Sequence, residues 1–456
     1  MKAFSEQEVW EKLDRFETQT GILDLQVDGW PAWQILRFTV ASKIQKLNWQ
    51  KPPASRGDLV TALLRGLNFW NIQRREYIVH SLYSGARNKT EKGYSDIWFE
   101  DLLENVPGGG KLIRYNAPGY SDRQSKLRTS YDYDTTLLIY FATFLAKVLP
   151  AKDTQNHAKK IADLASSQFS LPFITENFVL KRVSVTYWQN RLYKILLRAI
   201  RPKTIFVIDT TEFSLLSAAQ DLGIKLVELQ HGIFTRSHPR SLRPLYAESA
   251  ELLYPSALGL YGDFWKRELQ ETAIGKKGLI QVVGNPLLEK YRKQREGRMS
   301  PSSRSIIITT QPFDLASMRD FFKEFLGLTQ ENMKVIFKLH PASGSASGLL
   351  HDLTDPRVEI LSGLQEPNTY DLIAQSDFHL SVASACHYDA LAIGTPTIIL
   401  ALEGHELMLN LHEKGAASLV RTPQDLINLL KDGTGNPVNP DDFCKPGFCE
   451  TMKKLI

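Results

Sequence analysis

Short apolar runs alternate along most of this chain with longer segments in which apolar residues recur at helical spacing. Each run is rich in Ile, Val or Leu and leads into a polar or glycine-containing turn. This alternation predicts parallel strands joined by helices, the βαβ arrangement of a doubly wound α/β sheet. The strands that we expect lie at residues 77–81, 111–115, 205–208, 224–229, 258–261, 280–283, 306–308, 335–338, 358–361, 378–380 and 396–400.

Two segments depart from this alternation and favour helices alone, namely residues 1–50 and 131–201. Ser5 is the expected cap of the first helix, and Trp30-Pro31 marks a break in the helical pattern. The most apolar window, residues 137–149, is shorter than the roughly 20 residues that span a bilayer. We therefore expect a buried or amphipathic helix there and no transmembrane segment.

The chain has 456 residues, which favours several domains of roughly 100 to 200 residues each. A basic, polar stretch at 290–305 separates two groups of expected strands. We therefore predict a first Rossmann-like α/β domain at 1–287, with helical additions, and a second at 288–440. Whether the tail, 441–456, crosses back to the first domain stays open.

The composition is that of an ordinary globular protein, since 43% of the residues are hydrophobic and 23% are charged. Three cysteines without paired metal-ligand spacing favour a reducing compartment, and the polar amino terminus lacks a secretory signal, so we expect a cytoplasmic protein. Basic residues crowd at 181–203 and 286–304. They indicate either solvated helix faces or attraction to anionic lipid or an acidic glycan.

A histidine follows an expected strand in each predicted domain. His231 comes after the strand at 224–229, and His340 after the strand at 335–338. Ligands of open parallel sheets bind beyond the carboxyl ends of the strands. The two histidines are therefore candidates for opposite walls of one cleft between two α/β halves.

The motifs around these histidines resemble those of bacterial surface-polysaccharide glycosyltransferases. They are Gln-His-Gly at 230–232, Gly-Asn-Pro at 284–286, Lys-Leu-His-Pro at 338–341, Ser-Val-Ala-Ser at 381–384 and the segment 389–396, which ends in Gly-Thr-Pro. The group includes polysialyltransferases, the Kdo transferases of capsule and O-antigen, and the glycerophosphotransferases of teichoic acid synthesis. The resemblance covers about residues 205–420 and implies the GT-B fold, with the donor nucleotide in the second domain.

By this resemblance His340 contacts the donor phosphate. Lys338 shares a face with His340 if the strand geometry persists that far, which makes Lys338 a candidate for a second phosphate contact. Ser381 and Ser384 stand in a loop where hydroxyl and amide groups receive phosphate oxygens. Asp389 takes the place of an acidic residue that binds the nucleotide ribose. The structural alternatives are a plain turn at His340 and a helix cap at Ser384.

The acceptor side offers two candidates for the catalytic base. His231 resembles a histidine that is catalytic in the teichoic acid enzymes, while Asp209 follows the neighbouring strand. The structural alternatives are a tight turn before Gly232, and a helix start for Asp209 and Glu212. The weaker donor-site candidates are Gly232, Gly284, Asn285, Gln311, Glu403 and His405.

No Asp-x-Asp motif stands at the end of an expected strand, and no His-Glu-x-x-His or paired-cysteine motif is present, so we expect no metal cofactor. The sequence thus predicts a metal-independent glycosyltransferase that moves a sugar from a nucleotide-sugar to a glycan or lipid-linked acceptor for O-antigen or capsule. Contact with the inner membrane or an assembly complex stays open, and nucleic acid is not expected. The alternatives are a nucleotide-sugar 2-epimerase or hydrolase on the same fold, and a non-catalytic member of a polysaccharide assembly complex.

Overall fold

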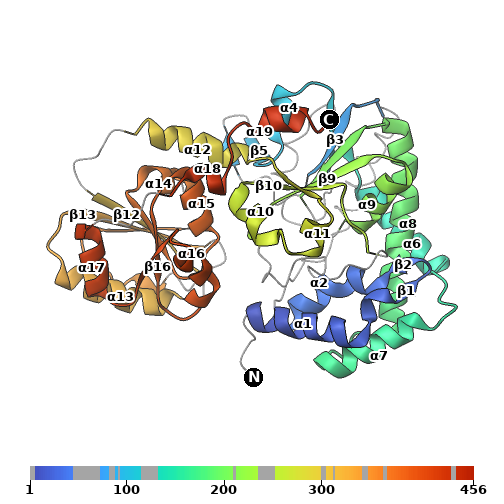
Figure 1. The fold of residues 1–456 in the computed structure, drawn as a ribbon, viewed down its shortest axis with the longest axis horizontal. Helices are drawn as coiled ribbons and strands as arrows, with labels where there is room; N and C mark the ends of the chain where they lie inside the picture. Colours follow the sequence, from blue (N-terminus) through green and yellow to red (C-terminus); the bar gives the residue numbers. More distant parts are fainter. Residues whose placement is uncertain are drawn as a thin grey trace. The chain divides into compact units, whose positions relative to one another are not determined.

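The computed structural model divides the chain into two compact units, each built on a parallel sheet (Figure 1). Unit 1 comprises Met1–Leu260, Trp265–Val283 and Gly447–Ile456, and unit 2 comprises Tyr261–Phe264 and Gly284–Pro446. The structure describes residues 6–44, 72–81, 88–90, 93–113, 132–208, 212–234, 252–298, 304–311, 314–340, 348–362, 367–432 and 438–456.

Unit 1 contains a seven-stranded parallel sheet in the order β11-β10-β9-β8-β3-β6-β7. Its strands are β3 (Tyr77–Ser81), β6 (Gly109–Ile113), β7 (Asp132–Asp134), β8 (Thr204–Val207), β9 (Lys225–Leu229), β10 (Ala257–Leu260) and β11 (Ile280–Val282). The chain runs outward from β3 to β7 and then restarts at β8, on the other side of β3. The switch point of this sheet therefore lies between β3 and β8.

A helical layer buries the apolar residues of this sheet. Its centre is α8 (Glu176–Ile200), which packs against α2 (Ala32–Ile44), α6 (Thr136–Val148), α7 (His157–Phe169) and α9 (Phe213–Asp221). The core formed with these helices includes strand residues Ile78, Leu112, Ile205, Val207 and Leu226. Further elements of unit 1 are α1 (Glu6–Thr20), η1 (Ile22–Asp24), β1 (Gln26–Val27), β2 (Trp30–Pro31), β4 (Asn88–Thr90), β5 (Gly93–Ser95), α10 (Asp263–Leu269, which begins in unit 2) and α11 (Ala273–Lys276).

The end of the chain packs on unit 1. Helix α19 (Phe448–Lys453) contacts α4 (Glu100–Asn105). The backbone carbonyl of Leu455 accepts hydrogen bonds from Thr204 Oγ1 at 3.0 Å and from Lys225 Nζ at 3.1 Å. These contacts join the last residues to the amino-terminal ends of β8 and β9.

Unit 2 contains a six-stranded parallel sheet in the order β14-β13-β12-β15-β16-β17. Its strands are β12 (Arg304–Thr309), β13 (Met333–Lys338), β14 (Val358–Leu361), β15 (Phe378–Ser381), β16 (Thr397–Leu400) and β17 (Ser418–Val420). The topology repeats that of unit 1, with the switch point between β12 and β15.

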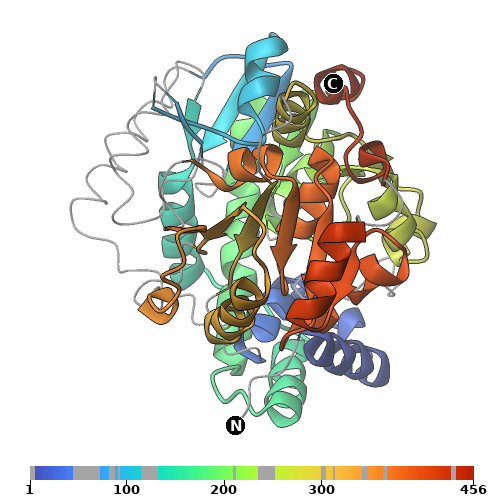
Figure 2. The same cartoon turned by 90° about the vertical axis from the view of Figure 1, so that its left-hand side faces the viewer.

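Helices cover both faces of the second sheet (Figures 1 and 2). One face carries α13 (Leu315–Leu328) and α17 (Pro423–Asp432), which contact each other. The other carries α12 (Pro286–Glu296), α14 (Thr369–Gln375) and α15 (Cys386–Ile393), which form a second contacting group. The remaining elements are η5 (His405–Met408), α16 (Leu409–Glu413) and α18 (Pro440–Phe443).

Every strand predicted from the apolar runs is present, with its ends shifted by at most a few residues. The prediction of helix from residue 131 was wrong for β7 (Asp132–Asp134), because this edge strand carries a single apolar residue and shows no strand periodicity. β17 was missed for a similar reason, since it is short. The predicted cap Ser5 lies outside the described residues.

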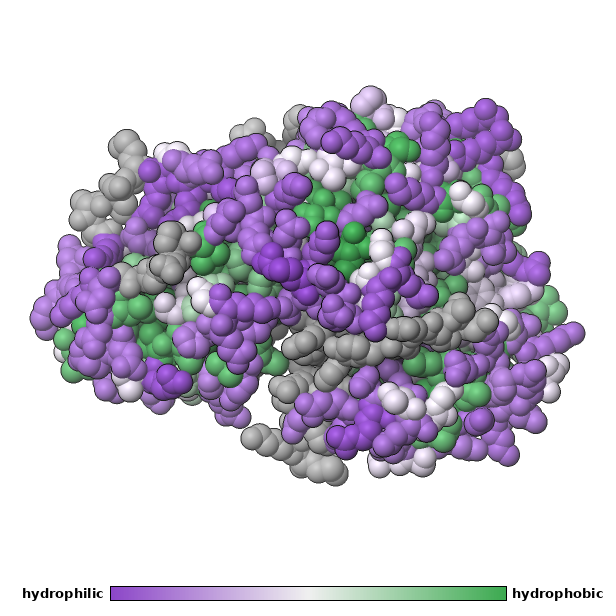
Figure 3. Space-filling view, in the orientation of Figure 1, coloured by the Kyte–Doolittle hydropathy of each residue, from purple (hydrophilic) through white to green (hydrophobic). Residues whose placement is uncertain are grey.

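The surface in the orientation of Figure 1 is mainly hydrophilic, with hydrophobic residues scattered among polar ones (Figure 3). Such scattering is usual for globular proteins. Within the described ranges, no helix combines the length and apolar character needed to cross a membrane.

Candidate functional site

The switch point of unit 2 brings together loops that leave two adjacent strands for different helices. Thr310 and Gln311 follow β12, whereas residues 382–385 connect β15 to α15. Because these loops diverge from neighbouring strands, the carboxyl edge of the sheet opens between them, and backbone donors there lack ladder partners. The phosphate-site candidates from the sequence stand at this edge.

Hydrogen bonds join three strand ends along this edge. The Thr310 amide donates to the Lys338 carbonyl at 3.2 Å, and the His340 amide donates to Thr310 Oγ1 at 3.3 Å. On the other side, Ser381 Oγ donates to the Thr309 carbonyl at 2.6 Å. The structure therefore places His340, Ser381 and the end of β12 in one connected group, as their positions in the sequence predicted.

His340 is exposed at this edge. Partial desolvation lowers its pKa from the ordinary value, so the imidazole is neutral at neutral pH. A neutral imidazole still has one N–H to donate. His340 can therefore donate a hydrogen bond to an anionic ligand, but it does not bring a full positive charge to the site. Pro341, the next residue of the motif, lies outside the described residues.

Lys338 is buried, and its ammonium donates to the carbonyl of Pro367 at 3.0 Å. Pro367 lies in the segment that leads into α14. This contact links β13 to the chain beyond β14, which gives Lys338 a structural role beside the expected phosphate contact.

Ser384 stabilises the start of α15 from the position before its N-cap, Ala385, which is close to the helix-cap alternative that the sequence left open. Its hydroxyl accepts a hydrogen bond from the Cys386 amide at 3.2 Å, at the start of α15. Burial raises the pKa of the Cys386 thiol to about 12, while the nearby hydroxyls of Ser384 and Thr309 lower it less. The thiol is therefore protonated and is no nucleophile at neutral pH.

A buried chain of histidines and threonines lies behind these strand ends and was missed by the sequence reasoning. Thr309 Oγ1 is 2.9 Å from His379 Nε2, and His379 Nδ1 is 2.7 Å from Thr397 Oγ1. The same Thr397 hydroxyl is 2.6 Å from Nδ1 of His387, in the first turn of α15. Burial lowers the pKa of His387 to about 3 and that of His379 well below its usual range, so both rings are neutral.

This chain connects β12, β15, β16 and α15 beneath the loop at 381–384. The signal in the sequence was the presence of polar residues at buried positions of otherwise apolar strands. Only the strand order shows that those residues share one layer.

Asp314 is a second group that the sequence reasoning missed. It immediately precedes α13, and its Oδ1 accepts a hydrogen bond from the Gln311 amide at 2.9 Å. Burial raises the pKa of this carboxyl to about 7, and backbone hydrogen bonds from Gln311 and its own amide oppose the rise. Gln311 is therefore held at the edge by a carboxyl group that is partly protonated at neutral pH.

Replacing Asp314 with asparagine should raise the free energy of unfolding by about 2 kcal/mol at pH 8. In the unfolded chain the carboxyl ionises near pH 4, whereas its folded pKa is about 7. The folded state thus binds the extra proton, and its stability falls as the pH rises between these values. Chemical denaturation at pH 8, pH 5 and pH 3.5 measures the difference, which should be smaller at pH 5 and disappear below about pH 4.

The matched control for this substitution is Asp320→Asn, an exposed carboxylate on α13. It should leave the pH dependence unchanged. An Asp314→Asn protein with wild-type stability at all three pH values contradicts the burial argument.

The remaining candidates of unit 2 stand in α15 and in the segment that follows β16. Asp389 is half-buried in the first turn of α15, and its charge contributes to the raised pKa of Cys386. Glu403 is exposed, three residues beyond the end of β16. His405 Nδ1 lies 2.8 Å from the Leu402 carbonyl at the start of η5.

In unit 1, the Gln-His-Gly motif forms a turn that holds its own shape at the end of β9. The backbone amide of the buried Gln230 donates to the Gly259 carbonyl at 2.8 Å. Its side chain donates from Nε2 to the Gly232 carbonyl, also at 2.8 Å. Gly232 has φ 156°, at the border of the region that favours glycine. The turn presents His231 at the surface, with its ring edge-on to Phe234 at 5.2 Å.

The other acceptor-side candidates follow β8 in the sequence. Asp209 is outside the described residues, so its position beside His231 stays a prediction. Glu212 is buried and immediately precedes α9, as the helix-start alternative predicted.

The Gly-Asn-Pro motif begins the first helix of unit 2. Gly284 has φ 84°, which a side chain disfavours, and Asn285 Oδ1 accepts from the amides of Leu287 at 2.9 Å and Leu288 at 3.2 Å. Asn285 therefore caps α12, and Pro286 takes the first helical position. The units divide between Val283 and Gly284, directly before this helix, whereas the sequence analysis placed the boundary at residue 287.

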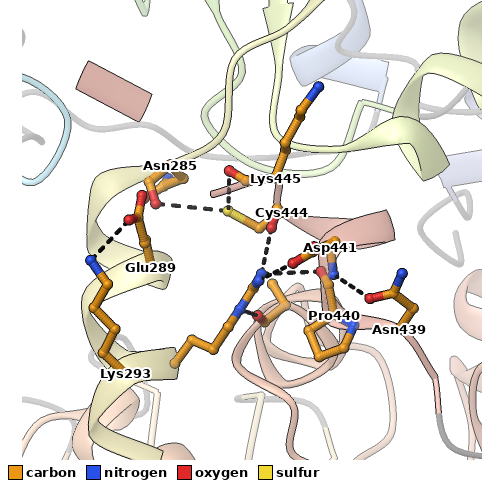
Figure 4. Close-up of polar contacts among 10 residues, drawn as sticks. Asn285, Glu289, Lys293, Asn439, Pro440, Asp441, Cys444 and Lys445 are labelled. Carbon is orange, nitrogen blue, oxygen red and sulfur yellow. Dashed lines mark hydrogen bonds and ion pairs between the residues drawn. The ribbon is translucent and has the colours of Figure 1, made fainter. Parts of the chain in front are cut away.

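Two arginines of the basic stretch at 286–304 fit neither a solvated helix face nor a surface that attracts anionic lipid or an acidic glycan. Arg292 is buried, and its guanidinium binds Asp441 and the carbonyls of Ala392, Pro440 and Cys444. Figure 4 labels three of these partners, Pro440, Asp441 and Cys444. Arg295 binds the carbonyls of Gly394 at 2.9 Å and Ser376 at 2.7 Å.

These two side chains join α12 to α15, α18 and the end of α14, so they hold unit 2 together. Lys290 and Lys293 are exposed and do fit a solvated helix face.

No protein-family model and no curated protein sequence matches this chain. Solved structures do match. A UDP-N-acetylglucosamine 2-epimerase aligns with a TM-score of 0.50 and 15% identity, over 84% of this chain and 94% of its own. The UDP-GlcNAc 2-epimerase of Neisseria meningitidis, bound to UDP-GlcNAc, aligns at 0.45 with 15% identity, over 83% and 98%. The calicheamicin glycosyltransferase CalG4 aligns at 0.45 with 12% identity, over 84% and 94%.

The likeness at a TM-score of 0.50 and the two parallel sheets confirm the GT-B fold that the motifs predicted. At 15% identity this likeness concerns the fold and not the reaction.

Proposed function

We propose that this protein is a glycosyltransferase that uses a nucleotide-sugar donor and builds a bacterial surface polysaccharide, O-antigen or capsule. The observation that supports the proposal most is the connected group at the switch point of unit 2. There Thr310, His340 and Ser381 join the ends of β12, β13 and β15. This is the edge at which doubly wound sheets bind nucleotides.

In the proposed reaction, His340 donates its N–H to a donor phosphate oxygen as the bond to the sugar breaks. Negative charge grows on the departing nucleotide, and a hydrogen-bond donor fixed at that oxygen lowers the barrier. The Ser384 hydroxyl and the backbone amides of the loop at 382–385 offer further donors to the phosphates, while the buried Ser381 hydroxyl holds the Thr309 carbonyl. We propose that this set replaces a metal ion, so that turnover persists in EDTA.

The acceptor hydroxyl must lose a proton as it attacks the sugar. We propose His231 or Asp209 of unit 1 as the base that takes this proton. His231 suits the role because its turn is fixed by Gln230 while its ring is exposed.

Conversion of a nucleotide-sugar panel in the presence and absence of a lipid extract from the source organism tests this proposal. A glycosyltransferase releases nucleotide only when the acceptor is present, and NMR of the sugar and phosphate signals follows both products. Interconversion of the sugar without acceptor identifies a 2-epimerase, and release of free sugar without acceptor identifies a hydrolase. Failure to bind or convert UDP-, CMP-, CDP- and GDP-sugars favours a non-catalytic assembly partner.

A further inference from the structure

Helix α6 of unit 1 presents a stripe of large apolar side chains to the outside. Phe141, Phe144 and Val148 have exposed fractions of 52%, 58% and 59%, and their spacing places them on one face of the helix. The two phenylalanine rings stack with centroids 6.5 Å apart. Leu149, just beyond the helix, extends the stripe with an exposed fraction of 53%.

The neighbouring helix α8 continues this apolar stripe. The two helices pack side by side (Figures 1 and 2). Trp188 donates from Nε1 to the Leu149 carbonyl at 2.8 Å, so its half-buried indole lies at the end of α6. Ile195, two turns further on the same face, has an exposed fraction of 64%. We call this the α6–α8 surface, formed by Phe141, Phe144, Val148, Leu149, Trp188 and Ile195.

Basic side chains border the α6–α8 surface. Arg191 and Arg198 lie four residues before and three residues after Ile195, on the same side of α8, and both are exposed. Lys147 is exposed beside Val148. α6 carries no acidic residue, and the single acidic residue of α8 is Glu176 in its first turn. The basic charges of this segment therefore share a face with exposed apolar groups.

We propose that the α6–α8 surface docks the protein onto an anionic phospholipid membrane. Apolar side chains enter the boundary between headgroups and acyl chains, and the arginines meet the anionic headgroups. Trp188 is suited to this boundary, where indole rings concentrate. Docking lies in the membrane plane, since α6 has 13 residues and is too short to span a bilayer.

The charges favour a lipid surface over a second copy of the chain. A symmetric dimer through this surface would bring Arg191 and Arg198 of one copy close to the same residues of the other. Like charges repel at such an interface, whereas an anionic membrane attracts them.

Vesicle co-sedimentation tests the proposal with the full chain. Wild-type protein should bind vesicles of phosphatidylcholine mixed with phosphatidylglycerol, and bind phosphatidylcholine alone much more weakly. The Arg191→Ala, Arg198→Ala double variant should lose about thirtyfold in affinity, because each basic residue near an anionic surface contributes about fivefold. The Phe141→Ser, Phe144→Ser double variant should lose at least about tenfold, from the apolar area withdrawn from the membrane.

Matched controls carry the same changes elsewhere. Leu328→Ser with Leu349→Ser alters exposed apolar residues of unit 2, and Lys323→Ala with Lys431→Ala removes exposed charges there. Both should bind vesicles as the wild type does, and all variants should keep its melting temperature. Wild-type affinity in the phenylalanine variant, or equal binding to both vesicle types, overturns the proposal. So does a wild-type dimer that the phenylalanine variant dissociates, because the surface is then an interface between copies.

Discussion

Replacing His340 with alanine should lower the rate of nucleotide release by about 10² to 10³-fold, while the melting temperature stays near that of the wild type. The side chain is exposed at the end of β13, so its loss removes little packing. Its backbone amide, which donates to Thr310 Oγ1, remains in the variant. The loss therefore reports on the imidazole N–H at the departing phosphate. Single-turnover rates of the two proteins with the same donor give the measurement.

His351→Ala provides the matched control, because His351 is also an exposed histidine of unit 2. This control should keep full activity. A His340→Gln variant should recover part of the lost rate, since its amide still donates a hydrogen bond. A well-folded His340→Ala protein with the wild-type rate removes His340 from the mechanism.

Lowering the pH from 7.5 to 5 should decrease the free energy of unfolding of the Asp314→Asn protein by about 4 kcal/mol. The buried histidines His379 and His387 should each account for about 2 kcal/mol of this decrease. Each histidine titrates near pH 6.5 when unfolded. Burial lowers the folded pKa of His387 to about 3 and that of His379 well below its usual range. The unfolded chain thus binds protons that the folded chain does not, so stability falls as the pH drops below 6.5.

The experiment uses the Asp314→Asn protein because the Asp314 carboxyl makes the wild type more stable as the pH falls, whereas the two histidines make it less stable. The folded pKa of this carboxyl, about 7, gives the wild type added stability over the same pH interval, which masks part of the loss. Denaturation curves of both proteins at several pH values separate the two effects. His351→Ala should leave the slope unchanged.

NMR signals of the histidine rings provide an independent test of the acid effect. Two rings should remain neutral at pH 5 in the folded protein. Protonation of all rings near pH 6.5, or a flat stability profile in the Asp314→Asn protein, contradicts a buried, neutral pair.

The sequence predicted the strands and the placement of His340 at a strand end well, because both depend on local order along the chain. An apolar run ending in a polar turn places His340 and Ser381 at strand ends whatever the tertiary details are. The repeated alternation likewise predicted two doubly wound sheets. The strands, the strand-end positions and the two sheets all depend on the order of neighbouring residues and on the pairing of parallel strands.

Properties that depend on distant partners were not predictable. Arg292 belongs to a basic segment, and only the structure shows that its guanidinium binds the Ala392 and Pro440 carbonyls, far along the chain. His379 meets Thr397 through the pairing of β15 with β16, and His387 reaches the same hydroxyl from α15. In both cases burial and partner choice arise from packing, which composition and spacing do not encode.

Hydrogen–deuterium exchange of the full chain with and without UDP, CMP, CDP and GDP tests the central claim most directly. A nucleotide that binds at the switch point should slow amide exchange in peptides that cover Thr310 and Gln311, His340, and residues 381–387. Peptides from β14 and β17, at the two outer edges of the same sheet, serve as internal references. Protection concentrated at the three strand ends is the predicted result. Protection confined to unit 1, or none with any nucleotide, contradicts the proposed donor site.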